Sequence, residues 1–275
     1  MYSIEKMYRT LLIVTILCFT IFQSCKNETV EIFVSQAGQA DNAGTKEAPF
    51  SEINDAIEKA YQIKQKDSKA EIVINVLSGD YYLSSPIVIN SALNGLKISG
   101  SRNSEVTVKG SAPLNLSWEK TESKILVANV TADIDFDQFI VNNKLQILAR
   151  YPNYNDNGGY WQGYAADAIS PDRIKNWENP EGAIFNAMHS GKWGGFHYEI
   201  AGIDSDGEAI LEGGFQNNRP SRPHPEYRMV ENVLEELDSP GEWFLDKVNH
   251  KIYYWPTSNV DLSAAKYEGV CNSLE

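Results

Sequence analysis

Short runs of β-branched residues between Ala70 and Leu114 constrain the fold more than any other feature of this chain. The runs are IVINV (72–76), IVIN (87–90), LKIS (96–99) and VTVKG (106–110), and turns rich in Gly, Ser and Asn separate them. Inward and outward residues alternate within each run, which predicts short strands with one buried face. Short strands with no helix between them are typical of a β-sandwich or of a parallel β-helix.

A helix is predicted directly before these strands. In SEINDAIEKAYQI (51–63), apolar residues recur with the spacing of one helix face, at Ile53, Ala56, Ile57, Ala60 and Tyr61. We therefore expect a helix over residues 52–64, with Ser51 as its N-cap. If coils of a β-helix follow, this helix would cover the apolar end of the first coil.

Residues 115–262 carry longer strands and more aromatic residues. Two hairpins are predicted: FHYEIAGID pairs with EAILEGGF around residues 205–207, and EWFLD pairs with KIYYWP across residues 247–250. Between them, residues 230–238 have the pattern of a short amphipathic helix that ends before Pro240-Gly241. Its polar face would hold Glu231, Glu235 and Asp238 in water.

The start of the chain predicts export. Met7-Tyr8-Arg9 precedes the twelve-residue apolar run LLIVTILCFTIF (11–22), which is too short to span a bilayer comfortably. Gln23-Ser24-Cys25 follows and resembles a bacterial lipobox, with Phe22 at the usual Leu position. We expect residues 1–24 to be a lipoprotein-type signal peptide, Cys25 to be lipidated and residues 25–31 to be a tether. A plain secretory signal is the alternative.

Charge and cysteine content exclude several classes of protein. The formal net charge is −13 at pH 7, so the chain would repel phosphate backbones and nucleic acid is not an expected partner. Cys18 leaves with the signal and Cys25 carries the lipid, so Cys271 alone remains, without a disulfide framework or a cysteine metal site. We expect no metal and no cofactor. The sequence has no Ser-His-Asp elbow, phosphate loop or HExxH motif.

Several segments together resemble a known family. IFVSQAGQADNAGTKEAPFSEINDAIEKA (32–60) resembles the start of secreted bacterial right-handed parallel β-helix proteins with the pectin lyase-like fold. FIVNNKLQILARYPN, WGGFHYEIAGID, LEGGFQNNRP, YRMVENVLEELDSPGEWFLD and IYYWP resemble the insertion of β-helix glycoside hydrolases of the α-L-fucosidase and xylanase group. The resemblance implies a mainly β fold with a cap helix and first coils at 32–114, a β-rich insertion domain at 115–262 and a resumed β-helix at 263–275.

The resemblance also implies a function. We expect an exported carbohydrate-active protein of glycoside-hydrolase type that binds polysaccharide or oligosaccharide and is anchored to the outer membrane through lipid, facing the periplasm or the cell surface. In the related enzymes the catalytic acids lie on coils beyond the insertion, whereas this chain stops at Glu275. We therefore expect no catalytic residue here and an inactive, truncated chain. The alternatives are a noncatalytic surface glycan-binding or adhesive protein and a polysaccharide lyase.

Candidate sugar-binding residues surround a glycine pair and a turn. His189, Trp193 and His197 flank Gly194-Gly195, where an indole beside exposed backbone amides suits a sugar ring. Packing of Trp193 in the core is the structural alternative. Gln216, Asn218 and Arg219 could donate to hydroxyls or to a carboxylate, or only form a turn, and Arg150 could bind substrate or an internal partner.

Acidic residues offer weaker candidates for chemistry. Glycosidases need two carboxylates, one of which stays protonated in a less polar setting. Glu242 and Asp246 bracket a predicted strand and would cap turns, although Glu242 is a weak candidate acid. A lyase would use clustered acids to hold Ca²⁺, for which residues 133–137 and 204–208 are candidates, although neither has EF-hand spacing and the second fits a hairpin turn.

Overall fold

The computed structural model describes residues 28–102, 105–131, 135–216, 219–220 and 222–271. They divide into two compact units, one within residues 28–81 and 85–108 and one within residues 82–84 and 109–271. The described residues are mainly β with few helices, which confirms the predicted class. The predicted signal peptide and Cys25 lie outside the described residues. Among the described residues, no helix is long and apolar enough to cross a membrane.

The helices are α2 (Ile53–Lys66) and α3 (Pro171–Ile174), and the 3₁₀ turns are η1 (Ser91–Leu93), η2 (Tyr160–Gln162) and η3 (Leu234–Glu236). The strands are β1 (Val30–Val34), β2 (Ile72–Val76), β3 (Gly79–Tyr82), β4 (Lys97–Gly100), β5 (Val106–Lys109), β6 (Ala112–Leu114), β7 (Glu119–Lys120), β8 (Leu126–Asn129), β9 (Phe136–Val141), β10 (Lys144–Leu145), β11 (Ile147–Leu148), β12 (Arg150–Tyr151), β13 (Ile184–His189), β14 (Gly195–Ile203), β15 (Ala209–Gly213), β16 (Phe215–Gln216), β17 (Arg219–Pro220), β18 (Pro223–Glu231), β19 (Glu242–Asp246), β20 (Lys251–Tyr254) and β21 (Tyr267–Cys271).

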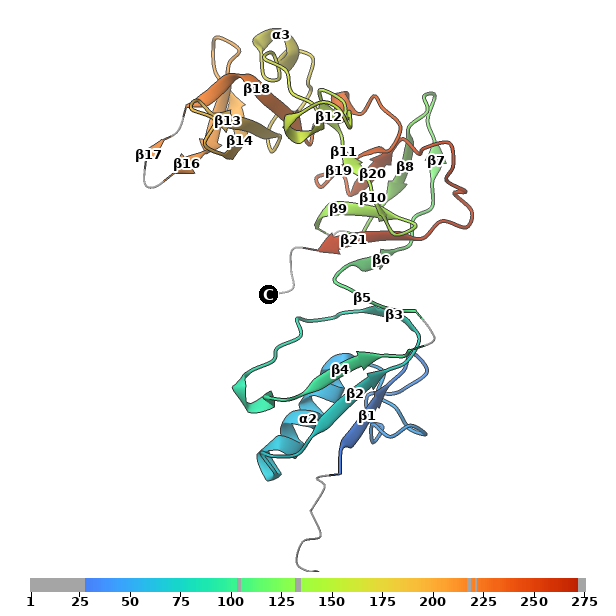
Figure 1. The fold of residues 1–275 in the computed structure, drawn as a ribbon. Coiled ribbons are helices and arrows are strands. Elements are labelled where there is room, and N and C mark those ends of the chain that lie inside the picture. Colours follow the sequence, from blue (N-terminus) through green and yellow to red (C-terminus); the bar gives the residue numbers. More distant parts are fainter. Residues whose placement is uncertain (1–27, 103–104, 132–134, 217–218, 221, 272–275) are drawn as a thin grey trace, which may run out of the picture. The chain divides into compact units, whose positions relative to one another are not determined.

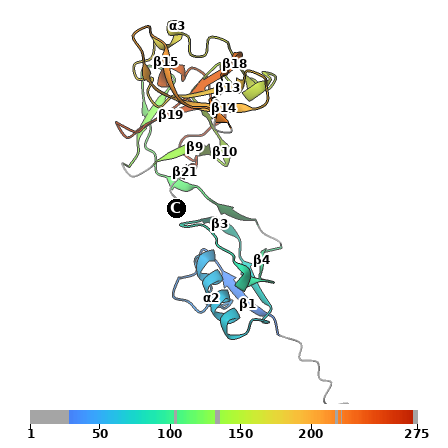
Figure 2. The same cartoon turned by 90° about the vertical axis from the view of Figure 1, so that its left-hand side faces the viewer.

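The first unit is built on a parallel sheet covered by α2 (Figures 1 and 2). Strands β1, β2 and β4 pair in that order, with Ile32 opposite Ile74 and Ile74 opposite Ile98. Side chains of β2 alternate between buried and half-buried, as the IVINV run predicts. The apolar face of α2 packs into the same core, which confirms the predicted helix. The N-cap prediction is wrong, because the helix begins one residue later and Glu52 is the N-cap, without a side-chain capping bond.

The run IVIN (87–90) does not form the predicted strand. It is an extended segment between Pro86, which lacks a backbone donor, and η1, where the Asn90 side chain accepts from the Ala92 amide at 3.0 Å. Ile87 is half-buried and packs against the core, but Val88 and Ile89 are 70% and 54% exposed, so the segment lacks the alternating buried face of a strand. Turn chemistry at both ends outweighs its β-branched composition.

The second unit contains two apolar cores. One lies between the sheet β11-β19-β20-β8-β7 and the sheet β10-β9-β21-β6, and aromatic side chains fill it, including Phe136, Phe139, Trp243, Tyr254 and Tyr267. The other lies on one face of the sheet β12-β18-β13-β14-β15, where Phe185, Tyr198 and Val230 pack with Ile174 and Trp177 from around α3. The sheet β12-β18-β13-β14-β15 carries the candidate residues Arg150, His189 and His197.

Both predicted hairpins are confirmed. β14 pairs with β15 and β19 pairs with β20, each in antiparallel register. In the first turn, Asp204 Oδ1 accepts from the amides of Asp206 and Glu208 at 2.9 Å and 3.0 Å. The hairpin interpretation of residues 204–208 is therefore confirmed.

The prediction of an amphipathic helix over residues 230–238 is wrong. β18 continues through Val230, which pairs with Phe185 and with Tyr151, and only a 3₁₀ turn follows at η3. Asn232 ends the strand with φ of 63°, and its side chain donates to the Gly182 carbonyl at 2.9 Å. Pairing on both sides of β18 therefore overrides a helix-like spacing of apolar residues.

Candidate functional site

Exposed aromatic side chains gather on the second unit. Trp193 lies in the turn between β13 and β14 and is 78% exposed, while Tyr160 in η2 and Tyr164 after it are 45% and 41% exposed. Half-buried Trp161 lies beside Tyr160, and half-buried Tyr227 lies in β18. We call these five residues the aromatic surface. Large exposed apolar groups that cluster, rather than occur singly, mark interaction sites.

The rings of the aromatic surface contact one another around Tyr227. Its ring centroid lies 5.1 Å from that of Tyr160 and 4.7 Å from that of Tyr164, both at steep interplanar angles. Tyr160 in turn lies 6.1 Å from Trp161. Edge-to-face contacts of this kind fix the rings relative to one another.

Lys192 connects the Trp193 turn to the tyrosines. Its Nζ donates to the Tyr227 hydroxyl at 3.3 Å and lies 4.5 Å from the centroid of the Tyr227 ring. The hydrogen bond with Tyr227 is the main cause that raises the pKa of Lys192, because it favours the ammonium form. The ammonium itself stays exposed to solvent.

The Trp193 turn has a rigid construction. The His189 amide donates to the Gly194 carbonyl at 2.8 Å, and His189 Nδ1 accepts from the Gly191 amide, also at 2.8 Å. The His189 ring then stacks on Trp193, with centroids 4.9 Å apart and planes 8° apart. A Cβ on Gly191 would lie 3.2 Å from His189 Nδ1 and 3.3 Å from the indole, so glycine leaves room for the stack. One face of the indole is thus supported.

A bulge in β18 presents Tyr227. Ala187 pairs with Arg228 and His189 pairs with Pro223, so four residues of β18, 224–227, lie opposite Met188 alone. Buried His224 holds this bulge, since its Nδ1 accepts from the amides of Glu226 and Tyr227 at 3.1 Å and 3.3 Å. Bulges commonly redirect a side chain next to a functional site.

Arg150 anchors the loop that carries Tyr160 and Trp161. It is 5% exposed, and its guanidinium donates to the carbonyls of Pro152, Trp161 and Gly163 at 2.9 Å, 2.8 Å and 3.1 Å. The observed contacts of Arg150 are therefore internal, and they position η2. Substrate binding by Arg150 itself stays a prediction.

The other sequence candidates lie outside the aromatic surface. His197 Nδ1 is hydrogen-bonded to the buried Asn186 amide, which also donates to Glu231 at 2.9 Å. The backbones of Gln216 and Arg219 pair across the β16–β17 hairpin, and Asn218 lies outside the described residues. His189 and Trp193 are thus brought together with four aromatic residues that the sequence reasoning passed over. The spacing of aromatic residues in GGYWQGY (158–164) was the available signal.

The acids around η3 and β19 have defined structural contacts. Glu235 is exposed, whereas Glu231 is half-buried and faces Asn186, so the predicted common solvated face does not form. Glu242 is 1% exposed, and its Oε2 accepts from the amides of Asp238 and Ser239, each at 3.0 Å, as predicted for a turn cap. Burial raises the pKa of Glu242 to about 7. Asp246 caps its own turn by accepting from the Asn249 amide.

Metal binding has no support in the described part of the chain. No group of three or more His, Cys, Asp or Glu side chains among those residues is placed to hold a metal ion. Asp204 Oδ1 accepts from two backbone amides of the hairpin turn. Part of the 133–137 segment lies outside the described residues.

Taken together, the aromatic surface offers fixed aromatic faces with polar rims. The Trp193 indole has one supported face, the tyrosines carry hydroxyls at their edges, and the Lys192 ammonium lies between them. Such a surface suits a ligand that has apolar faces and a polar edge. Because the rings are held by contacts with the protein, little side-chain freedom would be lost on binding.

Comparison with known proteins identifies the type of fold. No protein-family model matches the chain, and neither does any curated protein. A solved structure described as "Glycoside hydrolase" matches with a TM-score of 0.67 and 19% identity, over 87% of this chain and 46% of that chain. The chain has a glycoside hydrolase-like fold, and it spans less than half the length of that structure. A second structure, "The complex structure of XylC with xylose", matches with a TM-score of 0.33 and 15% identity, over 74% of this chain and 31% of that chain, which is too weak to support a conclusion.

Proposed function

We propose that this chain is the glycan-binding part of an exported carbohydrate-active protein of glycoside-hydrolase type, and that sugar binds at the aromatic surface. The observation that carries the proposal is the exposed Trp193 indole, supported on one face by the His189 ring. A pyranose ring has an apolar face of C–H groups and a rim of hydroxyls. Aromatic rings with polar edges match both parts of such a ring.

The arrangement of the tyrosines supports binding of a chain of sugars rather than of one. Tyr160, Tyr164 and Tyr227 add further ring faces and hydroxyls beyond Trp193, and Lys192 links the two groups. Rings from the β13–β14 turn, from the η2 loop and from the β18 bulge provide several places for stacking. Tyrosine and tryptophan contribute such contact area at low entropic cost, because each has only two side-chain torsions.

The finer family assignment is part of the same proposal. The glycoside hydrolase-like fold, the parallel pairing of β1, β2 and β4, and the resemblance of the sequence to the α-L-fucosidase and xylanase group support the first coils of a right-handed parallel β-helix. By that resemblance we propose that the catalytic acids are not among the residues of this chain, which would bind glycans without cleaving them. Export and lipid anchoring at Cys25 belong to this proposal and rest on the sequence of residues 1–25.

The proposal is tested by measuring glycan affinity of the chain without its signal segment. Affinity electrophoresis in gels that contain xylan, fucosylated glycans or pectin gives a dissociation constant for each. We expect retardation by at least one glycan and a loss of affinity of about tenfold or more in Trp193→Ala, since a central aromatic residue commonly carries this much binding energy. Tyr164→Ala should weaken the same interaction.

The matched control is Tyr253→Ala, which removes a half-buried aromatic ring from the β20 hairpin. If this control and Trp193→Ala reduce glycan affinity equally, the aromatic surface is not the binding site. Incubation with the same glycans tests the absence of cleavage. Release of reducing ends would contradict it, and a parallel rise in the ultraviolet absorbance of unsaturated uronates would indicate a lyase instead.

A further inference from the structure

We propose that the aromatic surface recognises acidic glycans, in which a carboxylate or sulfate group on the sugar pairs with the ammonium of Lys192. This inference rests on the proposed function, because it assigns a ligand class to the same surface. The shared chemistry is an anionic oxygen group beside a stacked sugar ring. Uronic acids and sulfate esters are its two sources in polysaccharides.

The backbone at Lys192 is the first observation. Lys192 has φ of 60° in the turn between β13 and β14, a conformation that costs a residue with a Cβ about 1 kcal/mol or more. Glycine or asparagine would adopt this conformation with less strain, and two glycines stand close by, at 191 and 194. A strained backbone at a lysine indicates that the lysine side chain itself has a role at this position.

The placement of the ammonium is the second observation. Lys192 Nζ is held beside Tyr227 by the hydrogen bond at 3.3 Å and the ring contact at 4.5 Å, yet the side chain is exposed. An ammonium has three N–H donors, and the Tyr227 hydroxyl accepts from one of them. Among the described residues no carboxylate forms an ion pair with Lys192, and Glu226 acts on its pKa only as the weakest of the effects, without direct contact. Donors thus remain available for a ligand.

Local charge differs from that of the whole chain. The net charge is −13, but residues 189–197 and 222–228, which adjoin through the His189–Pro223 pair, contain Lys192, Arg222 and Arg228 against Glu226 alone. Charges farther apart than a Debye length of about 8–10 Å are largely screened at physiological salt. Hydrogen bonds of the ammonium to an anionic group act within about 3 Å. The charges near Lys192, rather than the net charge of the chain, therefore determine whether an anionic group binds there.

The test compares glycans that share a backbone and differ in their anionic groups. Polygalacturonate and its fully methyl-esterified form share one backbone, and dextran sulfate and dextran form the corresponding pair for sulfate. For the unmodified chain we expect affinity for the acidic member of at least one pair to be about tenfold higher, as a charge-assisted hydrogen bond commonly provides, and to fall with added salt. The pair that shows the preference identifies the source of the anion.

Lys192→Met and Lys192→Arg separate charge from shape. The methionine variant keeps an unbranched side chain without the charge, and we expect its affinity ratio between acidic and esterified glycan to fall close to one. The arginine variant should retain the preference. An unmodified chain with equal affinity for both members of both pairs would overturn the inference, and so would a methionine variant that keeps the full preference.

Failure of this inference is distinguishable from failure of the proposed function. One outcome is that Trp193→Ala weakens glycan binding while Lys192→Met preserves the affinity ratio between acidic and uncharged glycan. In that case sugars bind at the aromatic surface, but Lys192 does not recognise their charge. If Trp193→Ala has no effect on any glycan, the proposed function itself is wrong. Circular dichroism of each variant checks that the sheet is intact, since both side chains are exposed and their loss should leave the spectrum unchanged.

Discussion

Glu242 is the residue whose burial has the clearest energetic consequence. It lies at the start of β19 and is 1% exposed, and one carboxylate oxygen, Oε1, is buried without a hydrogen-bond partner among the described residues. Burial is the main cause that raises its pKa from 4.5 to about 7. The two backbone amides that it accepts from, together with Arg150, only partly offset this effect.

Glu242→Gln should stabilise the chain at neutral and basic pH. Because the folded pKa is raised, the carboxyl is protonated in both states below pH 4.5, and stability is lost as the pH rises through about 7. A shift of this size corresponds to a penalty of about 3 kcal/mol once the folded state is ionised. Glutamine keeps an oxygen for the two amides and carries no charge, so urea unfolding at about pH 8 should show a gain of that order.

The control for this change is Glu181→Gln at an exposed position. It removes the same charge from the surface, where the effect on the free energy of unfolding should stay within about 0.5 kcal/mol. At about pH 4 the Glu242→Gln and unmodified chains should have similar stability, since Glu242 is then mostly protonated in both the folded and the unfolded state. Equal gains at both pH values would show that shape rather than charge is responsible.

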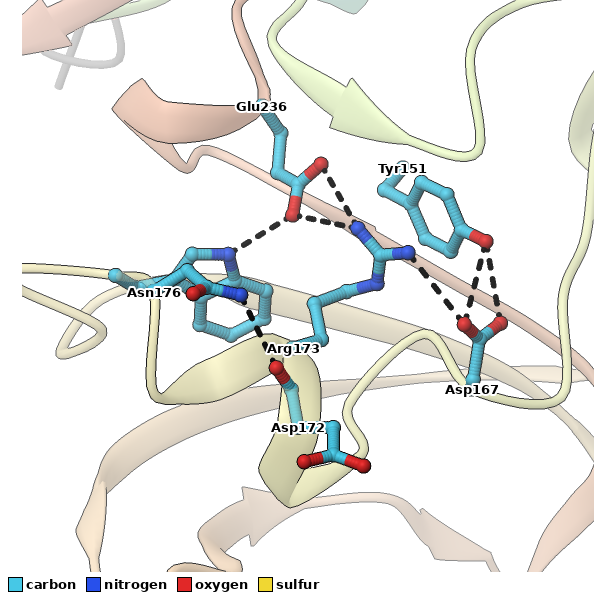
Figure 3. Close-up of polar contacts among 7 residues, drawn as sticks. Tyr151, Asp167, Asp172, Arg173, Asn176 and Glu236 are labelled. Carbon is cyan, nitrogen blue, oxygen red and sulfur yellow. Dashed lines mark hydrogen bonds and ion pairs between the residues drawn. The ribbon is translucent and has the colours of Figure 1, made fainter.

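At the scale of elements, two buried or half-buried arginines hold two different segments. Arg150 binds the carbonyls of the loop that carries η2. Arg173 of α3 donates to both oxygens of Glu236 at 3.0 Å and 3.2 Å and to Asp167 at 3.4 Å (Figure 3). Its guanidinium also lies 3.1 Å from the centroid of the Tyr151 ring, and Trp177 donates to Glu236 at 2.9 Å. The first arginine positions the aromatic surface, whereas the second fixes α3 to β12 and η3.

Arg150→Lys should loosen the η2 loop selectively. A lysine ammonium cannot reach three separated carbonyls as the planar guanidinium does, and unpaired buried carbonyls cost about 1–3 kcal/mol each. Hydrogen–deuterium exchange measured by mass spectrometry should therefore accelerate in residues 153–163, and glycan affinity should fall with it. Arg173→Lys is the matched control and should instead accelerate exchange in residues 171–177. Identical exchange patterns in the two variants would refute separate anchoring roles.

Some elements could be predicted from sequence because their signals are local. The apolar face of α2 and the turn residues of the two hairpins determine those elements with little help from the rest of the chain. Residues 230–238 could not be predicted in this way, since Val230 belongs to a strand only because β12 and β13 pair with β18 on both sides. The same holds for the candidate site. His189 and Trp193 lie beside a visible glycine pair, but Tyr227 joins them only through a bulge that involves distant pairing.

At the scale of the whole molecule, two buried carboxyls and the net charge determine how stability depends on pH. Glu268 of β21 is 2% exposed and accepts from Lys109 at 2.7 Å, Ser111 at 2.6 Å and Tyr82 at 3.1 Å. Burial alone would raise the pKa of Glu268, but these hydrogen bonds together lower it. Its contribution is therefore present above the unfolded pKa and is lost as the pH falls through the folded value, opposite to Glu242.

These effects predict a thermal stability maximum at mildly acidic pH. As the pH falls below 4.5, the ordinary glutamate pKa, protonation of Glu268 removes its ion pair with Lys109. As the pH rises through about 7, ionisation of Glu242 and the growing negative charge both destabilise the fold. The sequence pI of about 4.8 and the net charge of −13 at pH 7 place that repulsion on the basic side. Tm measured by calorimetry across this range should peak between the two limits.

Added salt should reduce the decline of Tm at higher pH, because it screens surface repulsion. Glu242→Gln should reduce that decline further. Lys109→Met should abolish the decline of Tm at acidic pH, because Glu268 then has no ion pair with Lys109 to lose. A Tm that rises steadily to about pH 8 would contradict the assignment of Glu242 as the dominant buried acid.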